Sequence, residues 1–143
     1  MVKFSLNFLF SGWLTARVQV ENAFNARHQV HESGEIVLLD RPCAWKDPLF
    51  DIEKKYNSVG QVKFVLFKDT SGGEGWRVQA VPAKLEAFTN RKSLRKEWCG
   101  LSKDAIAQVS GIEDIVFCHA NGFIGGAKSY ESALKMAVLS LQD

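Results

Sequence analysis

The sequence HANGFIGG, residues 119–126, decides our prediction of the fold. It follows the apolar run Ile115–Cys118, and apolar residues recur at helical spacing after it, from Tyr130 to Leu141. A buried strand, a glycine-rich turn and an amphipathic helix are therefore predicted in this order. Such a strand-to-helix turn points backbone N–H groups and a helix N-terminus toward an incoming anion.

The glycine-rich turn supports two interpretations. Gly125 and Gly126 would let a phosphate or sugar approach the backbone closely, and Lys128 would add a cation. Alternatively, the glycines would only allow the helix to pack on its strand. The stretch is neither a Walker A loop nor a complete GxGxxG fingerprint. His119 stands at the carboxyl end of the strand, where sites in α/β proteins tend to form, although a lone histidine is often structural.

The rest of the chain predicts a single α+β domain with a small mixed sheet of about four strands. Helices are expected at residues 4–27, from an N-cap at Asp47 to Tyr56, at 102–109 and from 130 to 141, with strands at 35–39, 61–67, 75–81 and 115–118. The strands at 61–67 and 75–81 flank a glycine-containing loop and should form an antiparallel hairpin. Arg77 and Gln79 share one face of its second strand, because side chains alternate along a strand.

Composition excludes several classes of protein. The chain has 143 residues with 46% hydrophobic content, enough for one domain with its own core. Its 18 basic and 16 acidic residues give a net charge of +2, so any site for a polyanion must be local. Three cysteines without CxxC spacing argue against a disulfide framework or structural zinc and favour a reducing compartment. The N-terminus is apolar but interrupted, and we expect no membrane partner.

Residues 83–101 form the most basic stretch, which we interpret as an ordered loop. Arg91 and Lys96 accompany the aromatic residues Phe88 and Trp98 there, a combination that single-stranded nucleic acids favour. In the alternative interpretation, Trp98 anchors the core and the cations are merely solvated. The histidines have no metal-ligand spacing, and no nucleophile–base arrangement stands out, so we predict neither a metal site nor catalytic residues in this chain.

Six motifs in unbroken order resemble the MYG (melanocyte proliferating gene) family of DHH-type phosphoesterases. They are Trp13-Leu14-x-Ala16-Arg17, Ser33-Gly34-Glu35-Ile36-Val37, Trp76-Arg77-Val78-Gln79-x-Val81-Pro82, Phe88-x-Asn90-Arg91-Lys92-x-Leu94, Val109-Ser110-Gly111-Ile112 and His119-Ala120-x-Gly122-Phe123-Ile124-Gly125-Gly126. The resemblance covers essentially the whole chain and implies the C-terminal, DHH-associated half of such a protein. Cys99 and Ala127 depart from the arginine and histidine found in some relatives.

The resemblance implies a substrate-binding domain of a metal-dependent, 3'-5' exonuclease-like hydrolase. Manganese or magnesium would be held by an N-terminal DHH-type catalytic domain, and the chain alone would be inactive. Single-stranded nucleic acid and that catalytic domain are the expected partners, and a homodimer is possible. The location would be intracellular: nucleus or mitochondrion in a eukaryote, otherwise cytoplasm. Substrate or phosphate contacts are predicted at Arg77, Arg91, His119, Gly122, Gly125, Gly126 and Lys128.

A different class of function competes with this one. The chain would be a non-catalytic regulatory or dimerisation module in which the glycine turn is purely structural. Its apolar N-terminal segment, with Phe4, Phe8 and Phe10, would then dock on a partner or a second copy.

Overall fold

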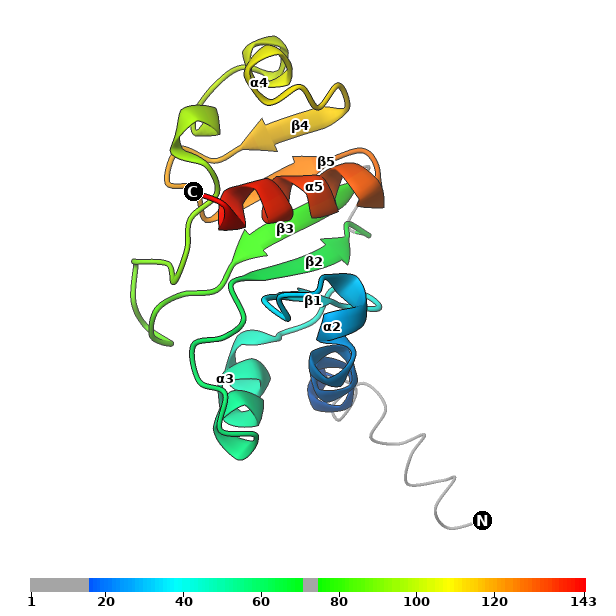
Figure 1. Ribbon diagram of the computed structural model, residues 1–143, viewed down its shortest axis with the longest axis vertical. Helices are drawn as coiled ribbons and strands as arrows, with labels where there is room; N and C mark the ends of the chain where they lie inside the picture. Colours follow the sequence, from blue (N-terminus) through cyan, green and yellow to red (C-terminus); the bar gives the residue numbers. More distant parts are fainter. Residues whose placement is uncertain (1–15, 71–74) are drawn as a thin grey trace.

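A computed structural model describes residues 16–70 and 75–143 (Figure 1). A helix covers residues 16–25 of the described chain, and the remaining elements are α2 (Arg27–Val30), β1 (Ile36–Leu38), α3 (Lys46–Lys55), β2 (Phe64–Lys68), β3 (Trp76–Ala80), the 3₁₀ turn η1 (Lys96–Trp98), α4 (Lys103–Ser110), β4 (Ile115–Cys118), β5 (Ile124–Ala127) and α5 (Tyr130–Leu141). The fold is therefore α+β, as predicted.

The strands form one mixed sheet in the order β1-β2-β3-β5-β4. β1 runs parallel to β2, and the other neighbouring pairs are antiparallel. The predicted hairpin is confirmed, with Phe64 opposite Ala80 and Lys68 opposite Trp76. The sheet has five described strands, whereas the sequence predicts about four. The additional strand is β5.

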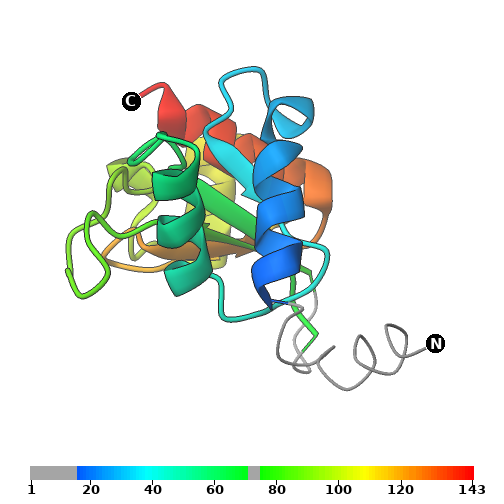
Figure 2. The ribbon, with the colours of Figure 1, turned by 90° about the horizontal axis from the view of Figure 1, so that it is seen from below.

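Helices lie on both faces of the sheet (Figure 2), and a hydrophobic core lies on each face. On the first face, Met136 and Ala137 of α5 pack with Ile106 of α4 against strand residues that include Val78. On the second face, the helix at 16–25 and α3 pack on Val37 and Val65, which belong to β1 and β2. On the second face, the helices therefore cover mainly β1 and β2. On the same face, β3, β5 and β4 are less covered.

The predicted strand-to-helix glycine turn is wrong. Gly125 and Gly126 lie inside β5, which pairs with β3 on one side and with β4 on the other. The actual turn is at residues 119–123, between β4 and β5, and the helix α5 begins later, at Tyr130. The short strand was missed because two adjacent glycines are unfavourable in a strand interior unless another group approaches closely.

Smaller corrections have similar local causes. α3 begins at Lys46 with Trp45 as its N-cap residue, so Asp47 lies in the first turn instead of capping it. Tyr56 is 41% exposed, and its ring stacks on Phe24. β4 is an edge strand with two half-buried residues, so it is not fully covered on both faces. The first part of the helix predicted for residues 4–27, up to position 15, lies outside the described residues.

Two helix caps follow the sequence closely. The Ser102 hydroxyl accepts a hydrogen bond from the Ala105 N–H at the start of α4, and the Ser129 hydroxyl accepts one from Ser132 at the start of α5. Gly111 ends α4 with a φ of 74°, the left-handed conformation expected at such a helix end.

Candidate functional site: a groove between two loops

Two loops meet at the end of the sheet where β3 ends and β5 begins. The Ala80 N–H donates to the Phe123 carbonyl at 2.8 Å, which joins β3 to the 119–123 turn. The Leu94 N–H donates to the Gly122 carbonyl at 2.9 Å, which joins the 83–94 loop to the same turn. These backbone bonds hold two segments that are distant in sequence side by side.

A groove of about 220 Å³ lies between these loops. Its wall contains the aromatic residues Phe88 and Phe123, and Ala80, Pro82 and Ala87 add small apolar surfaces. Phe88 is fully exposed and Phe123 is 37% exposed, although phenylalanine is a residue that proteins usually bury. Exposed aromatic side chains beside a groove are typical of a binding surface.

Polar groups complete the groove. The side chains of Gln79, Asn90 and Asn121 line it, together with Lys46 from the first turn of α3. The Asn90 amide nitrogen donates to the Ser93 hydroxyl at 3.0 Å. The amides of Gln79 and Asn121 make no side-chain hydrogen bond within residues 16–70 and 75–143. They are therefore available as donors and acceptors for a ligand.

His119 borders the groove, as part of the 119–123 turn. Its ring lies edge-on to Phe123, with centroids 4.6 Å apart, and its Nδ1 accepts the Asn121 backbone N–H at 3.1 Å. Because Nδ1 is an acceptor, the neutral ring carries its proton on Nε2. The imidazole is exposed and shapes the turn that presents Phe123.

Gly122 has a structural reason to be glycine. Its φ of 67° is left-handed, and a Cβ there would lie 3.1 Å from the Ser93 Cβ and 3.2 Å from the Cys99 sulfur. The turn therefore needs both the conformational freedom and the small size of this residue.

Gly125 and Gly126 serve packing on opposite faces of the sheet. A Cβ on Gly125 would lie 2.8 Å from the Met136 Cε under α5, and one on Gly126 would lie 2.7 Å from the Phe117 ring. The same Cβ on Gly126 would approach a guanidinium nitrogen of Arg77 to 2.8 Å. Close approach of protein side chains explains both glycines, which is the packing interpretation of the motif.

Arg77 and Lys128 are placed away from the groove. The Arg77 guanidinium pairs with Asp69 at 2.8 Å and lies 5.3 Å from the centre of the Phe117 ring. Lys128 is exposed and follows the far end of β5, where its backbone N–H donates to Asp114. Arg77 nevertheless shares a sheet face with Gln79, two residues along β3, as predicted from strand alternation.

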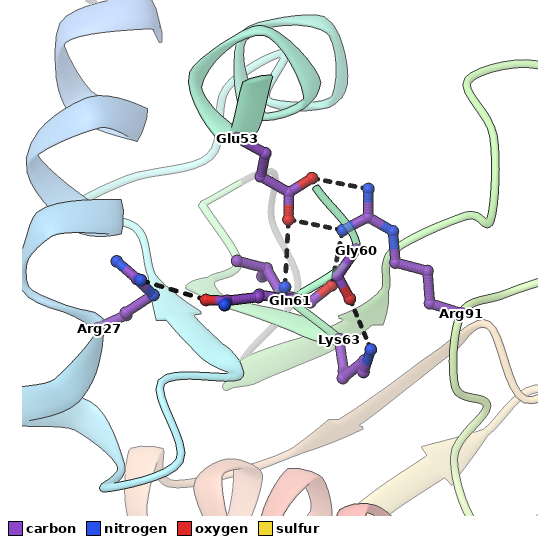
Figure 3. Close-up of polar contacts among 7 residues, drawn as sticks. Arg27, Glu53, Gly60, Gln61, Lys63 and Arg91 are labelled. Carbon is purple, nitrogen blue, oxygen red and sulfur yellow. Dashed lines mark hydrogen bonds and ion pairs between the residues drawn. The ribbon is translucent and has the colours of Figure 1, made fainter. Parts of the chain in front are cut away.

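Arg91 makes a buried ion pair with Glu53 of α3 (Figure 3). Both guanidinium Nη atoms donate to the carboxylate at 2.7 Å, and Nη1 also donates to the Val62 carbonyl at 3.0 Å. The side chains are 6% and 0% exposed. The Glu53 carboxylate also accepts the Val62 N–H at 3.1 Å, so its oxygens are well satisfied. This geometry gives Arg91 a structural partner inside the protein, whereas the prediction made it a substrate ligand.

The pair anchors the loop that carries Phe88. The Arg91 N–H donates to the Val81 carbonyl at 2.8 Å, and Pro82 forms a bridge with Asn90. These contacts close the base of the 83–89 loop against the end of β3. Arg91 therefore acts on the groove through the position of the loop.

The two interpretations of the basic stretch each hold for part of it. Trp98 is fully buried in the core on the α5 side, whereas Phe88 lies on the surface. The Arg95 Nε donates to the Leu139 carbonyl at 3.1 Å, so this cation lies at the C-terminal end of α5, where it is favoured. Lys96 is exposed.

The sulfur atoms of Cys99 and Cys118 lie 4.0 Å apart, just behind the 119–123 turn. Burial and the neighbouring Cys99 raise the pKa of Cys118 to about 12, so its thiol is protonated at neutral pH. Cys43 lies elsewhere, packed against the core of the second face.

Within residues 16–70 and 75–143, no three His, Cys, Asp or Glu side chains gather in a way that could hold a metal ion. No helix in that part of the chain is both long and apolar enough to cross a membrane.

Comparison with known proteins identifies the family. A family model described as "Uncharacterised protein family (UPF0160)", with the short name MYG1_exonuc, matches residues 2–141. The chain belongs to the MYG1 exonuclease family. It is 50% identical over 136 residues to the MYG1 protein of Dictyostelium discoideum, covering 95% of this chain and 41% of that protein. It is 42% identical over 137 residues to the MYG1 exonuclease of Bos taurus, covering 95% of this chain and 35% of the relative.

The chain therefore spans well under half the length of these MYG1 relatives. The MYG1 exonuclease of Homo sapiens gives the same picture, with 42% identity over 137 residues, 95% of this chain and 36% of that protein. No solved structure matches the chain.

Sequence reasoning identified only part of the groove of this MYG1 family member. His119 and Gly122 lie in the turn beside it. The sequence indicates Phe88 only as an aromatic residue of the basic stretch, and Gln79 only as the residue that shares a strand face with Arg77. Phe123 and Asn121 have no signal of their own beyond the glycine motif, and no local pattern marks Lys46. Placing Lys46 required knowing that α3 begins beside the end of β3.

Proposed function

We propose that this chain holds a single-stranded nucleic acid for a MYG1-type exonuclease and that the hydrolytic metals are supplied by another part of the whole protein. The chain would correspond to the C-terminal, DHH-associated half implied by the sequence motifs. Manganese or magnesium would activate water in the catalytic part, while this domain positions the phosphodiester.

The groove between the 83–89 loop and the 119–123 turn is the observation that carries the proposal. It combines two exposed phenylalanines, two amides without a partner in the described chain, and Lys46. Single-stranded nucleic acids are bound by aromatic platforms together with cations that contact phosphates. The names of the mammalian relatives, which describe them as exonucleases, fit this class of ligand.

The face of the sheet extends the surface beyond the groove. Arg77 of β3, Gly126 of β5 and Phe117 of β4 are register partners, so their side chains share the face that also carries Gln79. This side of the face is only partly buried among the described residues. A strand that enters the groove would pass next to an arginine and an aromatic ring.

Titration of short single-stranded RNA against the purified full chain at low and moderate salt tests the proposal. Binding should weaken as salt rises, because neutralising phosphates releases counterions. Lys46→Ala should lower affinity and flatten the salt dependence, and Lys128→Ala tests whether the far end of β5 takes part. The exposed cation Lys103, on α4, is the matched control for removal of one positive charge.

Two results would contradict the proposal. The first is an absence of RNA binding at either salt concentration. The second is robust, contaminant-free hydrolysis of RNA by this chain with added manganese, because the proposal places the metals in another part of the protein.

A further inference from the structure

One side chain of the groove is difficult to explain by folding alone. Phe88 lies in the 83–89 loop, whose base is fixed, and its ring is fully exposed. Leaving a large aromatic ring in water forgoes the stabilisation that burial would give. Its neighbour across the groove is Phe123, which is itself held in place by the edge of the His119 ring.

The groove has the dimensions and chemistry of a site for one planar ring. Its volume of about 220 Å³ is below the roughly 300–1,000 Å³ of pockets for drug-sized ligands, so it fits a part of a larger molecule. Small residues, Ala80 and Ala87, leave room beside the aromatic rings. Among the described residues that line the groove, Lys46 is the one with a charged side chain.

The groove also offers side-chain amides as hydrogen-bonding groups. Gln79 and Asn121 each offer an amide, which has a donor and an acceptor side by side. Amides pair in this way with base edges that present a donor beside an acceptor, as adenine does. Both amides make no side-chain hydrogen bond within the described chain, so a ligand edge would satisfy them.

We propose that the groove between the 83–89 loop and the 119–123 turn is a nucleobase subsite. One unstacked base packs against the rings of Phe88 and Phe123, the amides of Gln79 and Asn121 contact its edge, and Lys46 contacts the adjoining phosphate. This inference rests on the proposed function and adds to it, because it assigns recognition to a base where the proposed function requires only a strand.

The same architecture explains how the subsite is held open. One wall belongs to a loop closed by the Pro82–Asn90 bridge, and the other belongs to a turn bonded to β3 and to Leu94. Stacking requires rings at a fixed separation, and backbone hydrogen bonds on both sides provide it. Arg91 and Glu53 are positioning residues for this site, because they act through the loop.

The test compares a fluorescent oligoadenylate RNA with the same strand in which the bases are replaced by abasic residues. The wild-type chain should bind the adenylate strand about five- to 150-fold more tightly, the range that stacking of one base on an aromatic side chain provides. Phe88→Ala should lose most of this preference, and Phe88→Trp should keep it. Because Phe88 is fully exposed, neither change should unfold the protein.

Leu85→Ala is the matched control, since Leu85 is a 44% exposed apolar residue of the same loop that lies outside the groove lining. It should bind both strands like the wild type. Gln79→Ala should weaken binding of the adenylate strand more than binding of the abasic strand, because the amide is proposed to contact the base edge.

Equal affinity of the wild type for adenylate and abasic strands would overturn the subsite and leave the proposed function standing. Equal loss of affinity in Phe88→Ala and Leu85→Ala would also overturn it, because the loop would then act nonspecifically. If neither strand binds at all, the proposed function fails and the subsite fails with it.

Discussion

Glu53→Gln should be the most damaging of the conservative changes in this protein, because it leaves Arg91 buried without its counter-ion. The carboxylate is fully buried and accepts three hydrogen bonds, two of them from the guanidinium at 2.7 Å. Removing one partner of a buried ion pair typically destabilises a protein by about 3–5 kcal/mol. Unfolding entropy scales with chain length, so for 143 residues this loss corresponds to a fall in Tm of roughly 10–17 °C.

Urea denaturation and thermal unfolding, followed by circular dichroism, measure this effect. Asp51→Asn is the matched control on the same helix, because Asp51 pairs with Arg17 at 3.0 Å while its side chain is 66% exposed. An exposed pair of this kind contributes about 0–1 kcal/mol. The double variant Glu53→Gln with Arg91→Met should recover part of the stability, since it removes the unpaired buried charge while the amide oxygen of the glutamine can still accept the Val62 N–H.

The reasoning would be refuted if Glu53→Gln lowered the free energy of unfolding no more than Asp51→Asn does. It would also be refuted if the double variant were less stable than Glu53→Gln, since the unpaired charge could not then be the cause.

Other predictions concern the glycines and cysteines of the same region. Gly125→Ala should destabilise the fold by about 1–3 kcal/mol in urea, because its Cβ would lie 2.8 Å from the Met136 Cε and 3.1 Å from the Phe117 carbonyl oxygen; unchanged stability would contradict the packing role. A thiol oxidant such as diamide should join Cys99 to Cys118, whose sulfurs are 4.0 Å apart, and peptide mapping should find no disulfide to Cys43. The pKa of Cys118 is raised from 9.0 to about 12 in the folded state, so the protonated thiol's contribution to stability is complete below pH 9 and is lost as the pH rises toward 12. Cys118→Ala should therefore show a smaller loss of stability over that range than the wild type, and an identical pH profile would refute the assignment.

The sequence predicts the regular elements well where periodicity and end signals agree. The hairpin of β2 and β3 and the helix α4, between Ser102 and Gly111, follow directly from alternation and capping residues. The parallel pairing of β1 with β2 depends on tertiary contacts and has no local signal. β5 was missed because Gly125 and Gly126 resemble a turn, and only the three-dimensional arrangement shows the side chains that approach them.

The candidate site was harder to predict because its residues come from four separate segments. Lys46 begins α3, Gln79 belongs to β3, and Phe88 and Phe123 lie on different loops. Arg91 illustrates how the sequence conceals a structural partner. A basic residue in a basic stretch resembles a phosphate ligand, but its carboxylate partner is 38 residues away in sequence and is apparent only in the fold.

The buried Arg91–Glu53 pair also affects the thermodynamics of any encounter with a ligand. A loop that becomes ordered only on contact loses conformational entropy at that moment, and its affinity falls accordingly. Here the loop bearing Phe88 is tied to α3 and β3 during folding, so its ordering is complete before a ligand arrives. Such preorganisation leaves more of the contact energy for affinity, and it makes a residue remote from the groove, Glu53, a determinant of the dissociation rate.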